Sequence, residues 1–203
     1  MTLLVWAVPT VFAIILHEVM HGVVARVFGD DTAQRAGRLT LNPLPHIDPM
    51  GTIILPAILL FLRLPVFGYA RPVPVDFRRL NPARLGMIGV AAAGPLTNFT
   101  LAALSAIGIR LLYHASATGL ELAAVQILYA SVLINVMLGV FNLFPLLPLD
   151  GGRVLAGLLP IRLARGYARL ERYGIVILFL LLYTDWVGAV IDPIVNAITR
   201  ALL

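Results

Sequence analysis

The chain has 203 residues, of which 60% are hydrophobic and only 12% are charged. Soluble domains carry about a quarter charged residues, so this balance excludes an ordinary soluble protein and predicts a single membrane-embedded domain over residues 1–203. The net charge of +5 comes from arginine alone, which indicates loops held at the cytoplasmic face of a membrane and no nucleic-acid binding. The absence of cysteine excludes disulfides and thiolate metal sites.

The first predicted element is a membrane-spanning helix at about 3–25, which carries the stretch HEVMH and lacks the charged start and cleavage site of a signal peptide. His17 and His21 are one helical turn apart, so both imidazoles project from one face and can bind one metal ion. Glu18 between them is placed to take a proton from a water molecule on that ion. Ionisable groups at membrane depth are costly without a function. The stretch therefore predicts a metal site, against the alternative of two satisfied histidines in a helix bundle.

Two weaker signals follow in the region 26–84. The sequence AGRLTLN (36–42) alternates polar and apolar residues, which predicts one strand of a small β-hairpin near the candidate active site. Such a strand would either pair with an unwound substrate or only anchor the loop. The segment 51–75 is apolar enough to enter the bilayer, yet Pro56 and Pro65 interrupt it, so it is predicted to be a re-entrant or short spanning segment. A gate formed by this segment is a further hypothesis.

Three more spans are predicted, at about 85–112, 122–147 and 174–198. The last is interrupted by Asp185 and by Asp192-Pro193, so the span can be shorter than 174–198. The expected fold is an all-α polytopic membrane protein with a bundle of about four to six transmembrane helices, the re-entrant or short extra segment and the small β-hairpin.

The distribution of arginine predicts the topology. If the segment 51–75 enters and leaves on one side, the regions 26–50, 70–84 and 150–172 share one face and hold nearly all the arginines. If the segment crosses, this asymmetry weakens. The positive-inside rule therefore favours an even number of crossings, an N-terminus outside and an active site near the cytoplasmic side. Arginine without lysine is also typical of GC-rich bacterial genomes, so a bacterial cell membrane is expected.

Two histidines do not complete a catalytic zinc site, which needs a third protein ligand and an open position for water. The candidates are His46, Asp48, His114, Asp150, Asp185 and Asp192. Asp150 fits best, because the span 122–147 runs in the same direction as the first span under this topology and delivers Asp150 to the depth of the histidines. The alternative is a plain turn residue before two glycines. One Zn²⁺ per chain is predicted, held by His17, His21 and Asp150.

Four stretches carry a likeness to a known family: HEVMHG, GRLTLNPLPHIDPMGT, AAGPLTNF and FNLFPLLPLDGGRVL. With them the chain resembles the site-2 proteases, polytopic zinc metalloproteases that cut within membranes, and in particular the short branch without PDZ or CBS domains. The resemblance implies zinc bound by His17, His21 and Asp150. It also implies that Glu18 is the catalytic base.

Other polar residues have two possible roles each. The resemblance implies that Asn142 binds the peptide or its oxyanion, whereas the plain alternative is a helix-ending residue before Pro145. Asn98 matches a family motif and is expected to be structural. His46 and Asp48 are either partners that fix an imidazole or ties between a loop and the membrane interface.

The function predicted from the sequence is that of an intramembrane zinc endopeptidase, which hydrolyses transmembrane protein or peptide substrates within the lipid bilayer through zinc-activated water. The alternatives are a non-catalytic metal-binding membrane protein such as a transporter, and an inactive family member. The ionisable residues gather at one depth and no inverted repeat is visible, which argues against a transporter. Glu18 separates the two classes, because a carrier has no need of an acid between two ligands.

Overall fold

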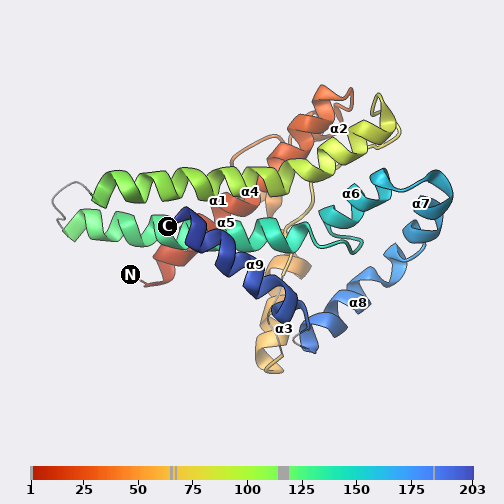
Figure 1. Cartoon of the computed structure of the whole chain (residues 1–203). Coiled ribbons are helices and arrows are strands. Elements are labelled where there is room, and N and C mark those ends of the chain that lie inside the picture. The colour runs from red at the N-terminus through yellow and green to blue at the C-terminus, as the bar shows by residue number, and fades with distance from the viewer. Residues whose placement is uncertain (1, 65, 67, 114–118, 185) are drawn as a thin grey trace.

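The computed structural model describes residues 2–64, 66, 68–113, 119–184 and 186–203, and within them every regular element is helical (Figure 1). In chain order the elements are α1 (Thr2–Val27), α2 (Thr32–Arg35), the 3₁₀-helix η1 (Leu44–His46), the π-helix η2 (Pro49–Ile54), α3 (Leu55–Phe61), α4 (Ala83–Tyr113), α5 (Gly119–Asn142), α6 (Asp150–Leu158), α7 (Ile161–Ala168), α8 (Glu171–Tyr183) and α9 (Trp186–Leu202).

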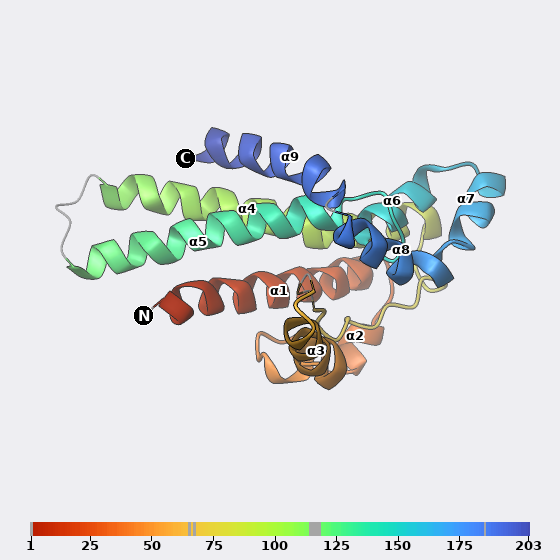
Figure 2. The ribbon, with the colours of Figure 1, turned by 90° about the horizontal axis from the view of Figure 1, so that it is seen from below.

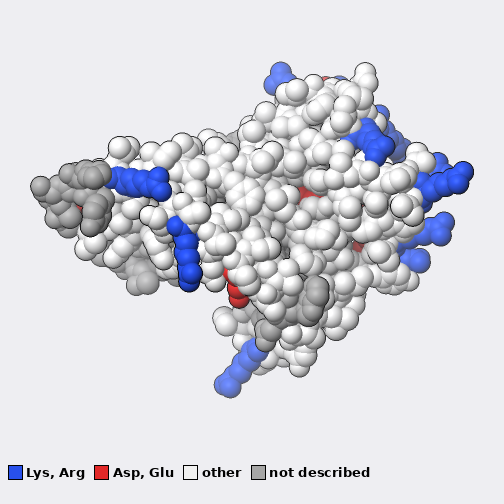
Figure 3. All heavy atoms as spheres, in the orientation of Figure 1, with Lys and Arg blue, Asp and Glu red and all other residues white. Residues whose placement is uncertain are grey.

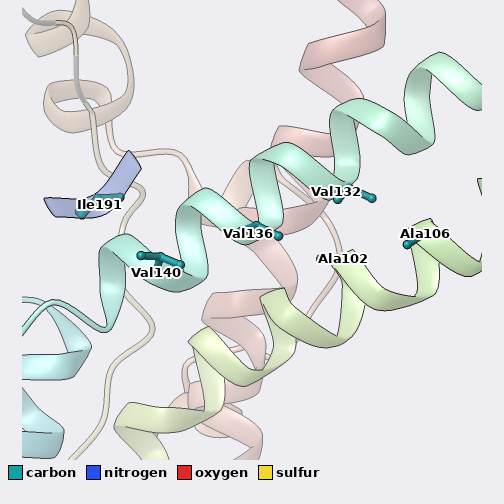
Figure 4. Close-up of a cluster of buried hydrophobic side chains, with 6 residues drawn as sticks. All are labelled: Ala102, Ala106, Val132, Val136, Val140 and Ile191. Atoms are coloured by element: carbon teal, nitrogen blue, oxygen red, sulfur yellow. The ribbon is translucent and has the colours of Figure 1, made fainter. Parts of the chain in front are cut away.

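The centre of the molecule is a bundle of α1, α4 and α5, in which α4 runs opposite to the other two (Figures 1 and 2). Small and β-branched residues make the contact between α4 and α5, with Ile191 of α9 added at its edge (Figure 4). Small side chains let helix backbones approach closely. In a bilayer the hydrophobic effect does not favour helix association, so such close packing is what holds membrane helices together. The buried cluster consists of Ala102, Ala106, Val132, Val136, Val140 and Ile191.

Three described helices are long and apolar enough to cross a membrane: Leu4–Val27, Ala83–Leu112 and Glu121–Asn142. They match three of the predicted spans. The third ends at Asn142 and not at 147, because Pro145 and Pro148 follow directly and cannot continue a helix.

The fourth predicted span, 174–198, is a bent pair of helices. Glu171–Tyr183 and Gly188–Leu202 meet at 78°, so the described chain has three candidate spans, or four if this pair counts as one. The expected four to six helices are therefore met only at the lower limit. Pro193 lies inside α9 and does not interrupt it, while Asp185 lies outside the described residues.

The apolar segment predicted at 51–75 doubles back on itself. The Tyr69 amide donates to the Gly51 carbonyl (3.1 Å) and the Arg71 amide to the His46 carbonyl (2.9 Å), so the two ends of the segment lie side by side. We call residues 49–64 the arm. Its helix α3 lies outside the α1–α4–α5 bundle in both views and is far shorter than a membrane span (Figures 1 and 2).

The predicted strand at 36–42 is wrong, since no β-hairpin occurs among the residues that the structure describes. Gly37, at a φ of +65°, closes a turn after α2. An alternating strand would place Arg38 and Leu41 on opposite faces, with the polar residue toward solvent. Instead Arg38 is buried, with its guanidinium bonded to the Arg71 carbonyl, and Leu41 is 57% exposed.

One end of the molecule is rich in arginine. On the face shown in Figure 3, arginine side chains gather over the end that carries α2, α6 and α7, with isolated ones elsewhere. The C-terminal end of α1, the C-terminal end of α5 and the start of α6 lie toward this same end (Figures 1 and 2). The histidines of α1 therefore lie in the half of the bundle nearest the arginines.

Candidate metal centre

Three of the side chains named from the sequence converge. His17 and His21 project from α1, and Asp150 is the first residue of α6. The Nε2 atoms of His17 and His21 lie 3.1 Å and 3.3 Å from Asp150 Oδ2. All three side chains are largely buried, and each has one ligand atom within 4.8 Å of the other two. The arrangement is thus a group of donors able to hold one metal ion.

Asp150 reaches the histidines because the chain turns back tightly after α5. A Cβ on Gly151 would lie 2.0 Å from the Leu143 carbonyl oxygen, so only glycine allows α6 to start here. The far end of α6 is held by Arg84 of α4, whose guanidinium donates to the Leu158 carbonyl (2.7 Å) and so satisfies a helix terminus. These two contacts fix α6, and with it Asp150, against the bundle.

Hydrogen bonds set the tautomer of each imidazole. His21 Nδ1 lies 2.7 Å from the Val90 carbonyl oxygen, which only accepts, so Nδ1 carries the proton and Nε2 keeps its lone pair. His17 Nδ1 lies 2.7 Å from Asn98 Oδ1. The Asn98 amide is oriented by its other end, because Nδ2 donates to the Ala13 carbonyl (3.3 Å). His17 therefore also presents a bare Nε2 to the centre.

The donor set fits zinc. Asp150 Oδ2 is buried and has no hydrogen-bond partner among the described residues, since neither facing Nε2 carries a hydrogen in these tautomers. Two nitrogen lone pairs and a carboxylate oxygen at 3.1–3.3 Å repel one another unless a cation lies between them. Ligand atoms about 2.1 Å from a tetrahedral zinc ion are about 3.4 Å apart, close to the spacing seen here.

Gly94 of α4 provides the space for both imidazoles. A Cβ at this position would lie 2.5 Å from His17 Cε1 and 2.6 Å from the Nε2 atoms of His17 and His21. Any side chain here would collide with the two rings. The glycine therefore lets α4 pass directly beside the metal-binding atoms.

Glu18 lies beside the cluster. Its Oε2 accepts a hydrogen bond from the Val73 amide (2.8 Å), and its carboxylate interacts electrostatically with His21 and with Arg38. One oxygen of the candidate base is thus engaged by the backbone of a segment far along the chain.

Asn142 is the last residue of α5, and its Nδ2 donates to the Leu138 carbonyl one turn earlier (3.0 Å). This geometry matches the helix-ending alternative. The remaining aspartate of the C-terminal region, Asp192, is exposed on α9. Two further candidates, His114 and Asp185, lie outside the described residues.

His46 and Asp48 make hydrogen bonds within the loop that follows α2. His46 Nε2 lies 3.0 Å from the Thr40 carbonyl oxygen, and Asp48 Oδ1 accepts from the Gly51 amide (2.8 Å) at the start of η2. Neither bonds to the imidazoles of α1 in the described structure. These contacts lie within the loop itself, and a tie between the loop and the membrane interface stays a prediction.

Sequence reasoning missed the part played by Asn98, which was expected to be structural. Asn98 is fully buried, binds His17 through Oδ1 and donates from Nδ2 to Asn135 Oδ1 (2.9 Å). Asn135 in turn donates to the Ser131 carbonyl (2.9 Å). The available signal was an asparagine inside a predicted apolar span, because a buried amide must find partners.

Comparisons with known proteins agree with this geometry. The family model described as Peptidase family M50 matches residues 111–184. YwhC of Bacillus subtilis (strain 168) is 39% identical over 188 residues, which cover 90% of this chain and 81% of that protein. No solved structure matches the chain.

Two more distant relatives extend the comparison. Zinc metalloprotease MJ0392 of Methanocaldococcus jannaschii is 29% identical over 76% of this chain, and Rip2 of Mycolicibacterium smegmatis is 31% identical over 83%. The matches span only 35% and 62% of those two proteins. All three relatives have the words zinc metalloprotease in their names. From this likeness and the His–His–Asp cluster, the chain belongs to peptidase family M50, the site-2 protease family, and is a zinc metalloprotease of that family.

Proposed function

We propose that the protein is an intramembrane zinc endopeptidase in which His17, His21 and Asp150 hold the metal and Glu18 is the general base. The observation that supports this most is the convergence of two unprotonated Nε2 atoms and an unpartnered Asp150 oxygen beside a carboxylate. A catalytic zinc site needs three protein ligands and one open position for water. Hydrolysis also needs a general base beside that water, and the Glu18 carboxylate can serve as one.

Zinc bound there supplies a Lewis acid that lowers the pKa of a water molecule and polarises the scissile carbonyl. Glu18 takes the proton of the attacking water and passes it to the leaving amine. Asn98 and the Val90 carbonyl keep the rings of His17 and His21 turned toward the metal position.

The Asn142 amide is the proposed donor to the oxyanion. Its Nδ2 now donates to Leu138 within α5, so the side chain must rotate to reach a substrate. A donor aimed at developing negative charge would supply part of the transition-state stabilisation.

The proposed substrates are transmembrane segments of proteins or peptides, taken up by one membrane-embedded domain over residues 1–203. The arginine-rich end faces the cytoplasm by the positive-inside rule, and the metal site lies near that face. The arm is proposed to dip into the bilayer and return, because its ends lie side by side and its helix carries exposed apolar residues.

Two variants test this proposal. Glu18→Gln is expected to keep zinc near the wild-type content and to lower kcat by about 10²–10⁴-fold, the usual contribution of a general base. Asp150→Ala is expected to lose the zinc itself. Metal content of purified protein and cleavage of transmembrane peptides are the measurements.

Glu171→Gln is the matched control, since Glu171 is exposed and pairs only with Arg153 (3.3 Å) among the described contacts. It should retain both zinc and cleavage. Full cleavage by the Glu18→Gln variant would overturn the assignment of the base. A zinc-loaded wild type that cleaves no transmembrane peptide would favour the non-catalytic alternative.

A further inference from the structure

The segment 71–76, with the sequence RPVPVD, is held in place by its backbone amides. The Val73 amide donates to Glu18 Oε2 (2.8 Å) and the Asp76 amide to Asp30 Oδ2 (2.7 Å). At the other end the Arg71 amide donates to a carbonyl of the preceding loop (2.9 Å). Because Arg71 and Val73 each precede a proline, both are restricted to extended backbone. The segment is thus a stiff connection with fixed points at both ends and at Glu18.

Asp30 fixes the C-terminal end of the 71–76 segment. It is fully buried after the end of α1, and it accepts from the Asp76 amide and from both the amide and the hydroxyl of Thr32. Burial alone would raise the pKa of Asp30, but these hydrogen bonds lower it below its usual value. The carboxylate therefore stays charged and continues to hold Asp76.

Arg38 fixes the N-terminal end of the 71–76 segment. Its side chain is buried, and Nη2 donates to the Arg71 carbonyl (2.6 Å). This carbonyl lies two residues before the amide that binds Glu18. With φ of Pro72 fixed by its ring, a displacement of the Arg71 carbonyl is transmitted to the Val73 amide.

The surroundings of Arg38 are poor for stability. Its Nε is buried without a hydrogen-bond partner in the part of the chain that the structure describes. Arg71 is a neighbouring like charge, and Glu18 is a neighbouring opposite charge. A buried guanidinium is costly unless it is fully paired. An apolar residue at this position would leave fewer polar groups unpaired. The arginine is therefore better explained by its hydrogen bond to the Arg71 carbonyl.

We propose that Arg38 is a positioning residue: it fixes the Arg71 carbonyl so that the Val73 amide holds one oxygen of Glu18 and leaves the other free for the proton of the attacking water. The inference rests on the proposed role of Glu18 as base. It adds to that role a loop residue that acts through the backbone of 71–76 and is not one of the proposed metal ligands.

Three variants test it in the full-length, zinc-loaded protein. Arg38→Ala should lower kcat by about 10- to 100-fold, as is usual for groups that orient an active site, with KM and zinc content near wild type. Arg38→Lys keeps a donor and a charge and should recover part of the loss, and added guanidinium should partly rescue Arg38→Ala. Arg35→Ala is the control, because Arg35 is an exposed arginine paired with Asp31 on the surface.

Hydrogen exchange gives a readout that does not depend on cleavage. Pro72 and Pro74 lack amides, so within 71–76 only four residues exchange, among them Val73. In Arg38→Ala the Val73 amide should exchange faster, and in Arg35→Ala it should not change.

Wild-type kcat or unchanged exchange at Val73 in Arg38→Ala would overturn the proposal. A fall in kcat that follows a fall in zinc content, without recovery in Arg38→Lys, would also overturn it, since that pattern is one of lost folding. If the Glu18→Gln variant cleaves normally, the proposed function fails instead, and the exchange experiment still decides whether Arg38 controls the 71–76 segment.

Discussion

The bundle of α1, α4 and α5 and the region 36–76 hold the candidate site in different ways. In the bundle, the histidines are fixed by groups that come from a packed neighbouring helix, namely the Asn98 amide and the Val90 carbonyl of α4. In the region 36–76, the irregular segment 71–76 is fixed by single polar side chains that lie far from it in the sequence, namely Glu18, Asp30 and Arg38. The two histidine ligands are therefore set by helix packing, whereas one oxygen of the candidate base is held by a loop.

The physical origin of this difference is the backbone. A helix satisfies its own amides and carbonyls, but an irregular segment must find a partner for each buried group. The 71–76 segment finds three of its partners in the side chains of Glu18, Asp30 and Arg38. A catalytic carboxylate that also serves as a backbone acceptor is thereby coupled to the position of the loop.

The largest effect is expected where the bundle is tightest, at Gly94. Gly94→Ala would place a Cβ 2.5–2.6 Å from the rings of His17 and His21, and these rings are already pinned by hydrogen bonds. We expect α4 and α1 to separate or the imidazoles to rotate, with loss of most bound zinc and of cleavage. Metal content per purified chain measures this directly.

Gly108→Ala on the same helix is the matched control. Among the described residues, a Cβ there would meet only the Leu128 side chain, at 3.1 Å or more, and alanine favours a helix over glycine by about 1 kcal/mol. Zinc content and thermal stability should stay at or above wild type. Equal zinc contents in the two variants would show that the bundle does not need its close contact at Gly94.

A smaller effect is expected at Asn98. Asn98→Ala removes the acceptor for His17 Nδ1, so the ring is free to rotate and can change tautomer, and zinc affinity should fall by about 10- to 100-fold. Competition with a chelator of known affinity measures this. The cost to folding should be about 1–3 kcal/mol for the buried groups left without partners.

Asn135→Ala separates these two effects, because Asn135 belongs to the same buried network but does not touch His17. It should cost similar stability and leave zinc affinity nearly unchanged. If both variants weaken zinc equally, the network acts as a whole, and Asn98 has no special place in it.

The sequence predicted the parts of the site that depend on local periodicity and on chain direction. The HEVMH stretch places His17 and His21 on one helical face because four residues are about one turn. The directions of the spans were enough to bring Asp150 to the same end of the bundle. Both inferences need only regular helices, and the bundle consists of regular helices.

The contacts of the loop were not predictable in this way. Arginine is rarely buried, so nothing in the local sequence indicates a buried Arg38, and its burial depends on a carbonyl that lies 33 residues further along the chain. Likewise, nothing near Asn98 in the sequence indicates that it faces His17, 81 residues earlier. Short polar–apolar alternation, as in 36–42, fits a strand only if a partner strand exists, and none is present among the described residues.

The smallest effect on the enzyme is expected at the end of helix α3 in the arm. This test concerns where the region 36–76 lies relative to the membrane. Phe61 is 86% exposed, so Phe61→Cys should leave zinc content, cleavage and thermal stability close to wild type. Since the chain contains no cysteine, the new thiol can be probed alone in sealed membranes. If the arm re-enters the bilayer, a membrane-impermeant maleimide should fail to label it from either side, whereas Asn42→Cys and Arg78→Cys should be labelled from the same side. Labelling of those two positions from opposite sides would mean that the segment crosses the membrane, and the proposed topology would then have to be abandoned.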